Sequence, residues 1–160
     1  MVFRWDSYLE LAREQRDSLK TYSGDLTDAK LRSSISRTYY AVFNIAVEYL
    51  RDVEREPILN AKQRQLGGEV ISREELNRIE KALRSVHQHI QQSFKKSTGV
   101  SKADRIRQSV AMILGQLCDE RKEADYNKEY APKLATLTVQ IRDADTLIGY
   151  IDQLKEITKS

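Results

Sequence analysis

The sequence predicts an all-α fold, in which about five helices form an up-and-down bundle and residues 1–160 make a single domain. Apolar residues recur at three- and four-residue steps along most of the chain, which is the spacing of one buried helix face. Helix-starting and helix-stopping residues separate these stretches, and no stretch has the alternating pattern of a strand. Only two prolines and six glycines interrupt the chain, which also suits a helical protein.

The first predicted helix begins at a capping box, Ser7-x-x-Glu10, in which the two side chains bind backbone N–H groups left free at a helix start. This helix ends near Gly24. A second helix begins around residues 25–28 and runs to about Glu56, because Pro57 disfavours a helical conformation in the residue before it. The expected apolar faces are Tyr8, Leu11, Ala12 and Leu19 in the first helix and Leu31, Ile35, Val42, Ala46, Tyr49 and Val53 in the second.

Residues 57–71 are predicted to form a connection, with one short helical turn around residues 59–65. A second capping box, Ser72-x-x-Glu75, opens a third helix, and Gly99 ends it. The expected apolar face of this helix is Leu76, Ile79, Leu83, Val86, Ile90 and Phe94.

The last two predicted helices are the most regular. Ser101-x-x-Asp104 starts the fourth helix, whose apolar positions continue to Ala124. Pro132, at a first-turn position, opens the fifth. The apolar residues of the fifth helix keep a seven-residue repeat, the pattern of a seam between bundled helices. They are Leu134, Leu137, Ile141, Ala144, Ile148 and Ile151.

Composition limits the classes of protein that the chain can belong to. A net charge of +3 is too modest to indicate a nucleic-acid-binding protein by itself. Cys118 is the only cysteine, so no disulfide framework is possible and a reducing compartment is expected. The N-terminus lacks the apolar core of a signal peptide, and the longest nearly apolar run, residues 39–47, is too short to span a bilayer. We therefore expect a soluble cytoplasmic protein with no membrane partner.

No metal site and no cofactor are expected from the sequence. His87 and His89 are two positions apart and lie on different faces of their helix, so they cannot share a metal ion. Cys118 has no histidine at helical spacing that would activate its thiol. Gly67-Gly68 indicates a turn and not a phosphate-binding loop.

Two clusters of residues carry the functional signal: residues 36–43, Ser-Arg-Thr-Tyr-Tyr-Ala-Val-Phe, and residues 121–126, Arg-Lys-Glu-Ala-Asp-Tyr. Arg121 lies one turn after Cys118 on the apolar stripe of its helix, so it should point into the bundle. An arginine there is costly unless it is paired, for example with Asp125, or lines a polar cleft. Because each cluster combines arginine with tyrosine, we expect a cleft that binds an anion.

Together these residues resemble the HEPN family of small helical bundles. The matching pieces are Ser7–Ala12, Leu31–Phe43, His87-x-x-Ile90-x-x-x-Phe94 and Arg121-x-x-Ala124-Asp125-Tyr126. The likeness spans nearly the whole chain apart from the connection at 57–71. It implies an intracellular bacterial or archaeal protein, commonly a homodimer. Many relatives are encoded beside a minimal nucleotidyltransferase, and many are metal-independent ribonucleases of toxin–antitoxin or defence systems.

In the catalytic branch of the HEPN family, an arginine steadies the phosphate, and a histidine later on the same helix exchanges protons with the ribose hydroxyl or the leaving oxygen. Arg121 matches this arginine, but no histidine follows it, and Asp125 and Tyr126 occupy that neighbourhood. Aspartate is too acidic to be a good general acid near neutrality. The candidate catalytic residues are Arg121, Asp125 and Tyr126, and the candidate ligand-binding residues are Arg37, Tyr40 and His87.

Three functions remain open from the sequence. The first is a HEPN-type protein that binds RNA or a nucleotide and acts as a metal-independent endoribonuclease. The alternative, which the missing histidine favours, is a non-catalytic helical partner subunit of a nucleotidyltransferase. In the third, the chain is a purely structural dimer whose cleft is filled by its own ion pairs, such as that between Arg121 and Asp125. Arg37 and Tyr40 then only pack within the bundle, and His87 is a hydrogen-bonded helix residue.

Overall fold

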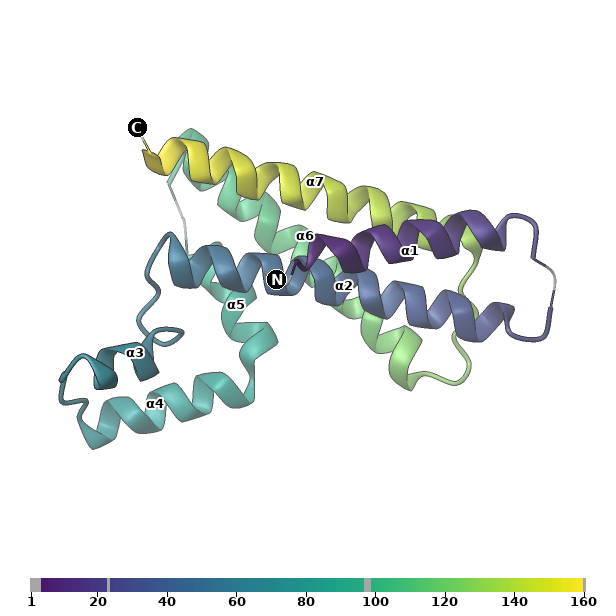
Figure 1. Ribbon diagram of the computed structural model, residues 1–160. Coiled ribbons are helices and arrows are strands. Elements are labelled where there is room, and N and C mark those ends of the chain that lie inside the picture. The colour runs from purple at the N-terminus through teal and green to yellow at the C-terminus, as the bar shows by residue number, and fades with distance from the viewer. Residues whose placement is uncertain (1–3, 23, 97–98, 160) are drawn as a thin grey trace.

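The computed structural model describes residues 4–22, 24–96 and 99–159, and these residues form seven helices and no strand. The helices are α1 (Asp6–Leu19), α2 (Thr27–Asp52), α3 (Ala61–Leu66), α4 (Arg73–Arg84), α5 (Val86–Lys95), α6 (Lys102–Tyr126) and α7 (Leu134–Lys159). The four long helices α1, α2, α6 and α7 pack side by side and alternate in direction, and α3–α5 are inserted between α2 and α6 (Figure 1). The predicted all-α bundle is confirmed. Across the described ranges, every helix is too short or too polar to traverse a lipid bilayer.

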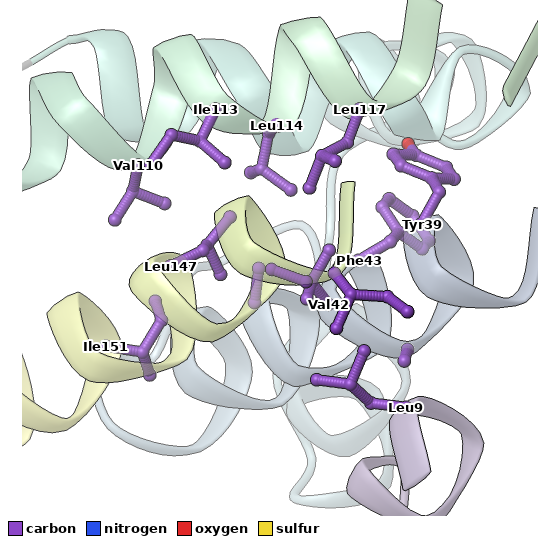
Figure 2. Packing of buried hydrophobic residues seen from close by; sticks show 14 of the residues in the cluster. Leu9, Tyr39, Val42, Phe43, Val110, Ile113, Leu114, Leu117, Leu147 and Ile151 are labelled. Carbon is purple, nitrogen blue, oxygen red and sulfur yellow. The ribbon is translucent and has the colours of Figure 1, made fainter. Parts of the chain in front are cut away.

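The hydrophobic core lies between the four long helices. Leu9 of α1, Val42 of α2, Leu117 of α6, and Leu147 and Ile151 of α7 meet there, each at most 1% exposed (Figure 2). These residues come from the apolar positions that recur at three- and four-residue steps. Full burial of one such side chain stabilises the fold by roughly 1.5–3 kcal/mol. The four long helices therefore form one packed unit on which the other helices are placed.

The predicted third helix over residues 72–99 is instead two helices, α4 and α5, which meet at Ser85. Ser85 has φ −120° and ψ 47°, outside the helical region, and the chain changes direction there. As a result Phe94 of α5 is fully buried, whereas Leu83 of α4 remains 49% exposed. The break also places His87 in the first turn of α5, which packs against α6.

The capping box at the start of α6 forms completely. Ser101 Oγ accepts a hydrogen bond from Asp104 N at 3.1 Å, and the Asp104 carboxylate accepts one from Ser101 N at 3.3 Å. At the start of α4 only half of the box forms, since Ser72 Oγ accepts from Glu75 N at 3.2 Å. The Glu75 carboxylate instead accepts a hydrogen bond from Arg64 at 2.9 Å. Arg64 belongs to α3, which is the predicted short helical turn.

The start and the buried face of α1 differ from the prediction. The helix begins at Asp6, so Ser7 lies inside it and does not cap it. It also ends at Leu19, well before Gly24. Ala12 and Leu19 of the expected apolar face are buried, whereas Tyr8 and Leu11 are 36% and 43% exposed. Leu9, which is not part of the expected face, is buried with Ala12 and Leu19, so the buried face is rotated from the predicted one.

Two further predicted boundaries are wrong. The helix α2 ends at Asp52, short of Glu56. Arg55 adopts φ 56°, in the left-handed region that terminates helices, so the chain has left the helix before it reaches Pro57. At the other end of the molecule, Pro132 precedes α7, which begins at Leu134, and so does not occupy its first turn.

Replacement of Ser101 by alanine tests the capping assignment. Ser101→Ala removes the acceptor for Asp104 N, and we expect it to lower the free energy of unfolding by about 1 kcal/mol. Ser7→Ala is the matched control, because Ser7 caps no helix, and its effect should stay within about 0.5 kcal/mol. Urea unfolding followed by circular dichroism measures both, and equal costs for the two variants would contradict the assignment.

Candidate functional site

A hollow of about 670 Å³ opens where the end of α6, the middle of α2 and the start of α5 come together. The two sequence clusters lie on α2 and α6, which pack against each other, and α5 packs against both. This hollow is named the Arg121 cleft. Its lining residues are Tyr40, His87, Arg121, Lys122, Glu123, Tyr126 and Asn127.

Arg121 is buried at the cleft, as its place on the apolar stripe of α6 predicts. Only 5% of the residue is exposed. The guanidinium carbon lies 5.4 Å from the ring centre of Tyr39, 5.5 Å from that of Tyr40 and 5.9 Å from that of Tyr126. The faces of aromatic rings attract a cation at these distances. The three tyrosines therefore hold the guanidinium in place without occupying its N–H groups.

The hydrogen-bonding capacity of Arg121 is largely unused by the described residues. A guanidinium carries five N–H donors. Nη2 donates to Cys118 Sγ at 3.9 Å, a weak bond, and Nη1 lies 3.6 Å from Asp125 Oδ2 in an ion pair. The buried Nε has no partner. Buried donors are nearly always satisfied, so this side chain has donors to offer to an anionic ligand.

The second unpartnered buried atom within the described ranges lies outside the Arg121 cleft. It is Nε2 of His89, which lies 3.5 Å from the Glu56 carboxylate. Among the described residues, Arg121 is paired with the carboxylate of Asp125, whose side chain is itself 27% exposed and also accepts from Ser36 Oγ at 3.4 Å.

The guanidinium of Arg121 keeps its charge in this environment. Burial lowers its pKa, but the Cys118 thiol and the hydroxyls of Tyr40 and Tyr39 raise it, and the pKa ends above its ordinary value. A permanent buried cation that is only partly balanced is costly to the fold. An anion in the cleft would remove that cost.

His87 is the second functional group of the cleft, and Tyr39 holds it. Its Nδ1 lies 2.6 Å from the Tyr39 hydroxyl, and its ring centre lies 4.4 Å from that of Phe43. Figure 2 shows Tyr39 and Phe43 side by side at the edge of the core. Burial lowers the pKa of His87, and the positive charges of Arg121 and Lys122 lower it further, so the imidazole is neutral near pH 7.

The structure brings together four of the six candidate residues, namely Tyr40, His87, Arg121 and Tyr126. Asp125 lies beside Arg121 but does not line the cleft. Arg37 is outside the cleft, because its side chain faces α1 and donates to Gln15 Oε1 at 3.3 Å. The cleft therefore contains one of the two arginines that the sequence pattern associated with it.

Sequence reasoning did not assign a site role to four residues. Tyr39 lies in the first cluster, but its bond to His87 depends on how α5 packs against α2. Lys122 and Glu123 lie within the second cluster and line the cleft. Nothing in the sequence marks Asn127, which follows the last residue of α6.

A second hollow, of about 500 Å³, lies between the start of α1, α2 and α7 and suits an anion less well. Its charged lining residues are Asp6, Glu48, Asp52 and Asp152, with Arg4 and Lys155. Because carboxylates predominate, they would repel a phosphate. No set of three or more His, Cys, Asp or Glu side chains in the described part of the chain is arranged to hold a metal ion.

Comparison with known proteins gives no assignment. The chain matches no protein-family model, no curated protein and no solved structure. The geometry of the Arg121 cleft is therefore the basis for a functional proposal.

Replacement of Arg121 by methionine tests whether the fold needs this guanidinium. Methionine has nearly the same length and packs well against aromatic rings. Because the removed group is charged, buried and poorly hydrogen-bonded, we expect the free energy of unfolding to stay within about 1 kcal/mol of the wild-type value, or to rise. Urea unfolding at pH 7 measures the change.

Arg32 is the matched control, since its guanidinium is well satisfied. It donates to the carbonyl oxygens of Ala124 and Asn127 at 3.0 and 2.8 Å and to Asp28 at 2.7 Å. Arg32→Met leaves these acceptors without their donor and should cost about 2 kcal/mol or more. If Arg121→Met cost as much as Arg32→Met, Arg121 would be a structural residue and the interpretation would be wrong.

Proposed function

We propose that this chain binds RNA or a nucleotide, with a phosphate group held by Arg121. One observation carries the proposal: a buried, charged guanidinium makes one weak hydrogen bond to the described residues and faces an open hollow. Arginine is the side chain best suited to phosphate, because its planar N–H groups bind two oxygens at once.

The aromatic residues of the cleft favour a ligand that carries a base as well as a phosphate. Tyr40 lines the cleft, and Tyr126 is 75% exposed at its edge. Unstacked bases of single-stranded RNA and of nucleotides bind to such rings by stacking. A volume of about 670 Å³ falls within the usual range for a small-molecule site, so one nucleotide unit fits better than a duplex.

The charges around the cleft suit the binding of a single phosphate group better than the binding of a long nucleic-acid strand. Lys122 adds a positive charge beside Arg121, but Glu123 adds a negative one. The net charge of the chain is only +3. Long-range attraction is therefore modest, and affinity would come from contacts within the cleft.

The resemblance to the HEPN family adds two proposals about partners. A second copy of the chain would bring two Arg121 clefts together, and a nucleotidyltransferase would be the other partner. One observation favours a non-catalytic partner subunit as the second candidate function. The helix α6 presents Arg121 without a histidine after it, and Asp125, which lies in that neighbourhood, is too acidic to be a good general acid near neutrality.

Fluorescence anisotropy with a labelled single-stranded RNA, in the presence of chelator, tests the proposed binding. Arg121→Met should weaken binding about tenfold or more, because a charge-assisted bidentate contact to phosphate is worth roughly 1.5–3 kcal/mol. Adenosine monophosphate, added as a competitor, distinguishes a site that accepts a single nucleotide from one that needs a longer strand.

The control removes the same charge elsewhere. Arg142 is an exposed arginine on α7, paired with Asp143 and absent from the lining of the cleft. Arg142→Met should bind the RNA as the wild-type chain does. Equal affinities for wild type, Arg121→Met and Arg142→Met would overturn the proposal.

Light scattering of the purified chain tests the proposed dimer, which would have twice the single-chain mass of 18.5 kDa. A single-chain mass at micromolar concentration would contradict it. Coexpression with the protein encoded beside this chain tests the other partner. A neighbouring nucleotidyltransferase that copurifies in a fixed ratio supports that partner, and a neighbour of another class counts against it.

A further inference from the structure

We propose that His87 is the catalytic residue that transfers protons in the Arg121 cleft, so that RNA bound there is cleaved. The inference rests on the proposed binding of RNA. It assigns the proton-transfer group to α5, a different helix from the one that carries the phosphate-binding arginine.

Arg121 and His87 lie against the same two aromatic rings. The ring of Tyr39 is 5.4 Å from the Arg121 guanidinium carbon and 5.5 Å from the His87 ring centre. The ring of Tyr40 is 5.5 Å from the guanidinium carbon and 6.1 Å from the imidazole. Both groups also line the cleft. A phosphate bound to the guanidinium would therefore have an imidazole beside it.

The imidazole is held in a fixed orientation. The Tyr39 hydroxyl engages Nδ1 at 2.6 Å, and Phe43 and Tyr40 contact the ring. Nε2 lies on the other side of the ring and forms no hydrogen bond with the described residues. In catalytic histidines, a protein group usually holds one ring nitrogen by a hydrogen bond, and the other nitrogen stays free for the substrate.

The same contacts are compatible with Nε2 as the nitrogen that accepts a proton. When Nδ1–H donates to the Tyr39 oxygen, Nε2 carries the free lone pair. The Tyr39 hydroxyl also interacts with the Cys118 thiol, which provides an acceptor for its own proton. Burial, followed by the Cys118 thiol, raises the pKa of Tyr39, so the phenol stays protonated.

The charged and titratable groups around His87 keep it neutral near pH 7. Its pKa is lowered by burial and then by the positive charges of Arg121 and Lys122. The carboxylate of Glu123 also lines the cleft. Arg78 and Lys81 of α4 lie with His89 around a separate hollow. Among the described residues, the other titratable groups at or beside the cleft are Tyr39 and Tyr40 of α2 and Cys118, Asp125 and Tyr126 of α6. A neutral imidazole is the form that acts as a general base.

The proposed reaction is an internal transfer within RNA. Nε2 of His87 takes the proton of a ribose 2′-hydroxyl, and the 2′-oxygen forms a bond to the adjacent phosphorus. The bond between that phosphorus and the 5′-oxygen of the next nucleotide breaks, and this oxygen takes a proton from the imidazolium or from water. Arg121 stabilises the negative charge that builds up on the phosphate oxygens. The products end in a 2′,3′-cyclic phosphate and a 5′-hydroxyl.

Cleavage of an end-labelled single-stranded RNA in chelator, with binding measured in the same samples, tests the inference. His87→Gln should lower the cleavage rate about 100-fold or more and leave the affinity for RNA nearly unchanged. His89→Gln is the matched control and should cleave as the wild-type chain does, since His89 is not part of the cleft. An RNA that lacks the 2′-hydroxyls should bind but not be cleaved.

The pH dependence provides a readout that a structural role would not give. Because the pKa of His87 is lowered and its neutral form is the active one, the rate should rise with pH and level off, with its midpoint below about 6.5, the ordinary value for histidine. Tyr39→Phe keeps the ring but removes the partner of Nδ1, and it should slow cleavage and shift that midpoint. The Tyr39→Phe variant also tests the inference if the His87→Gln variant does not fold.

Each outcome separates this inference from the proposed function. Binding without any cleavage by the wild-type chain would overturn the role of His87 and leave the proposed function intact. Absence of both binding and cleavage would overturn the two together. Cleavage that persists in His87→Gln, that is unchanged in Tyr39→Phe, or that does not need the 2′-hydroxyl would also overturn the inference.

Discussion

A charged guanidinium lies almost completely buried against tyrosine rings, with most of its N–H groups unused by the described residues, and the rest of the site is arranged around it. Arg121 continues the apolar stripe of α6, so the packing that buries the stripe also buries the charge. Tyr39 and Tyr40 attract the cation through their faces and leave its donors free. The fold thus retains a group that is costly without an anion, and this cost is the physical reason to expect a ligand.

The bundle and the break between α4 and α5 decide what lies beside that guanidinium. The four long helices share a continuous apolar core, which fixes α2 against α6. Because the chain turns at Ser85, α5 packs on α6, where Gln91 donates to the Ala111 carbonyl oxygen, and it brings His87 to the cleft in its first turn. Tyr39 then contacts both functional groups, by its ring face at Arg121 and by its hydroxyl at His87.

The parts of this structure that could be predicted from the sequence are those that depend on a single helix. Helical periodicity alone determines that Arg121 shares a face with buried residues, and the structure confirms it. Other features depend on several helices at once. Ser85 breaks a helix although neither proline nor glycine marks the place, and Arg37 faces α1 because of the way in which α2 packs. The contact between His87 and Tyr39 joins residues 48 positions apart, so no local pattern reveals it.

The most direct test of the central claim observes the guanidinium of Arg121 itself. In a ¹H–¹⁵N spectrum the Arg121 Nε–H signal can be assigned by its loss in Arg121→Met. Phosphate bound to the Nη atoms changes the electron density of the whole delocalised group. We expect this signal to move saturably as adenosine monophosphate is added, while the Nε–H signal of Arg142 stays in place. An Arg121 signal that does not move at millimolar ligand would contradict the account.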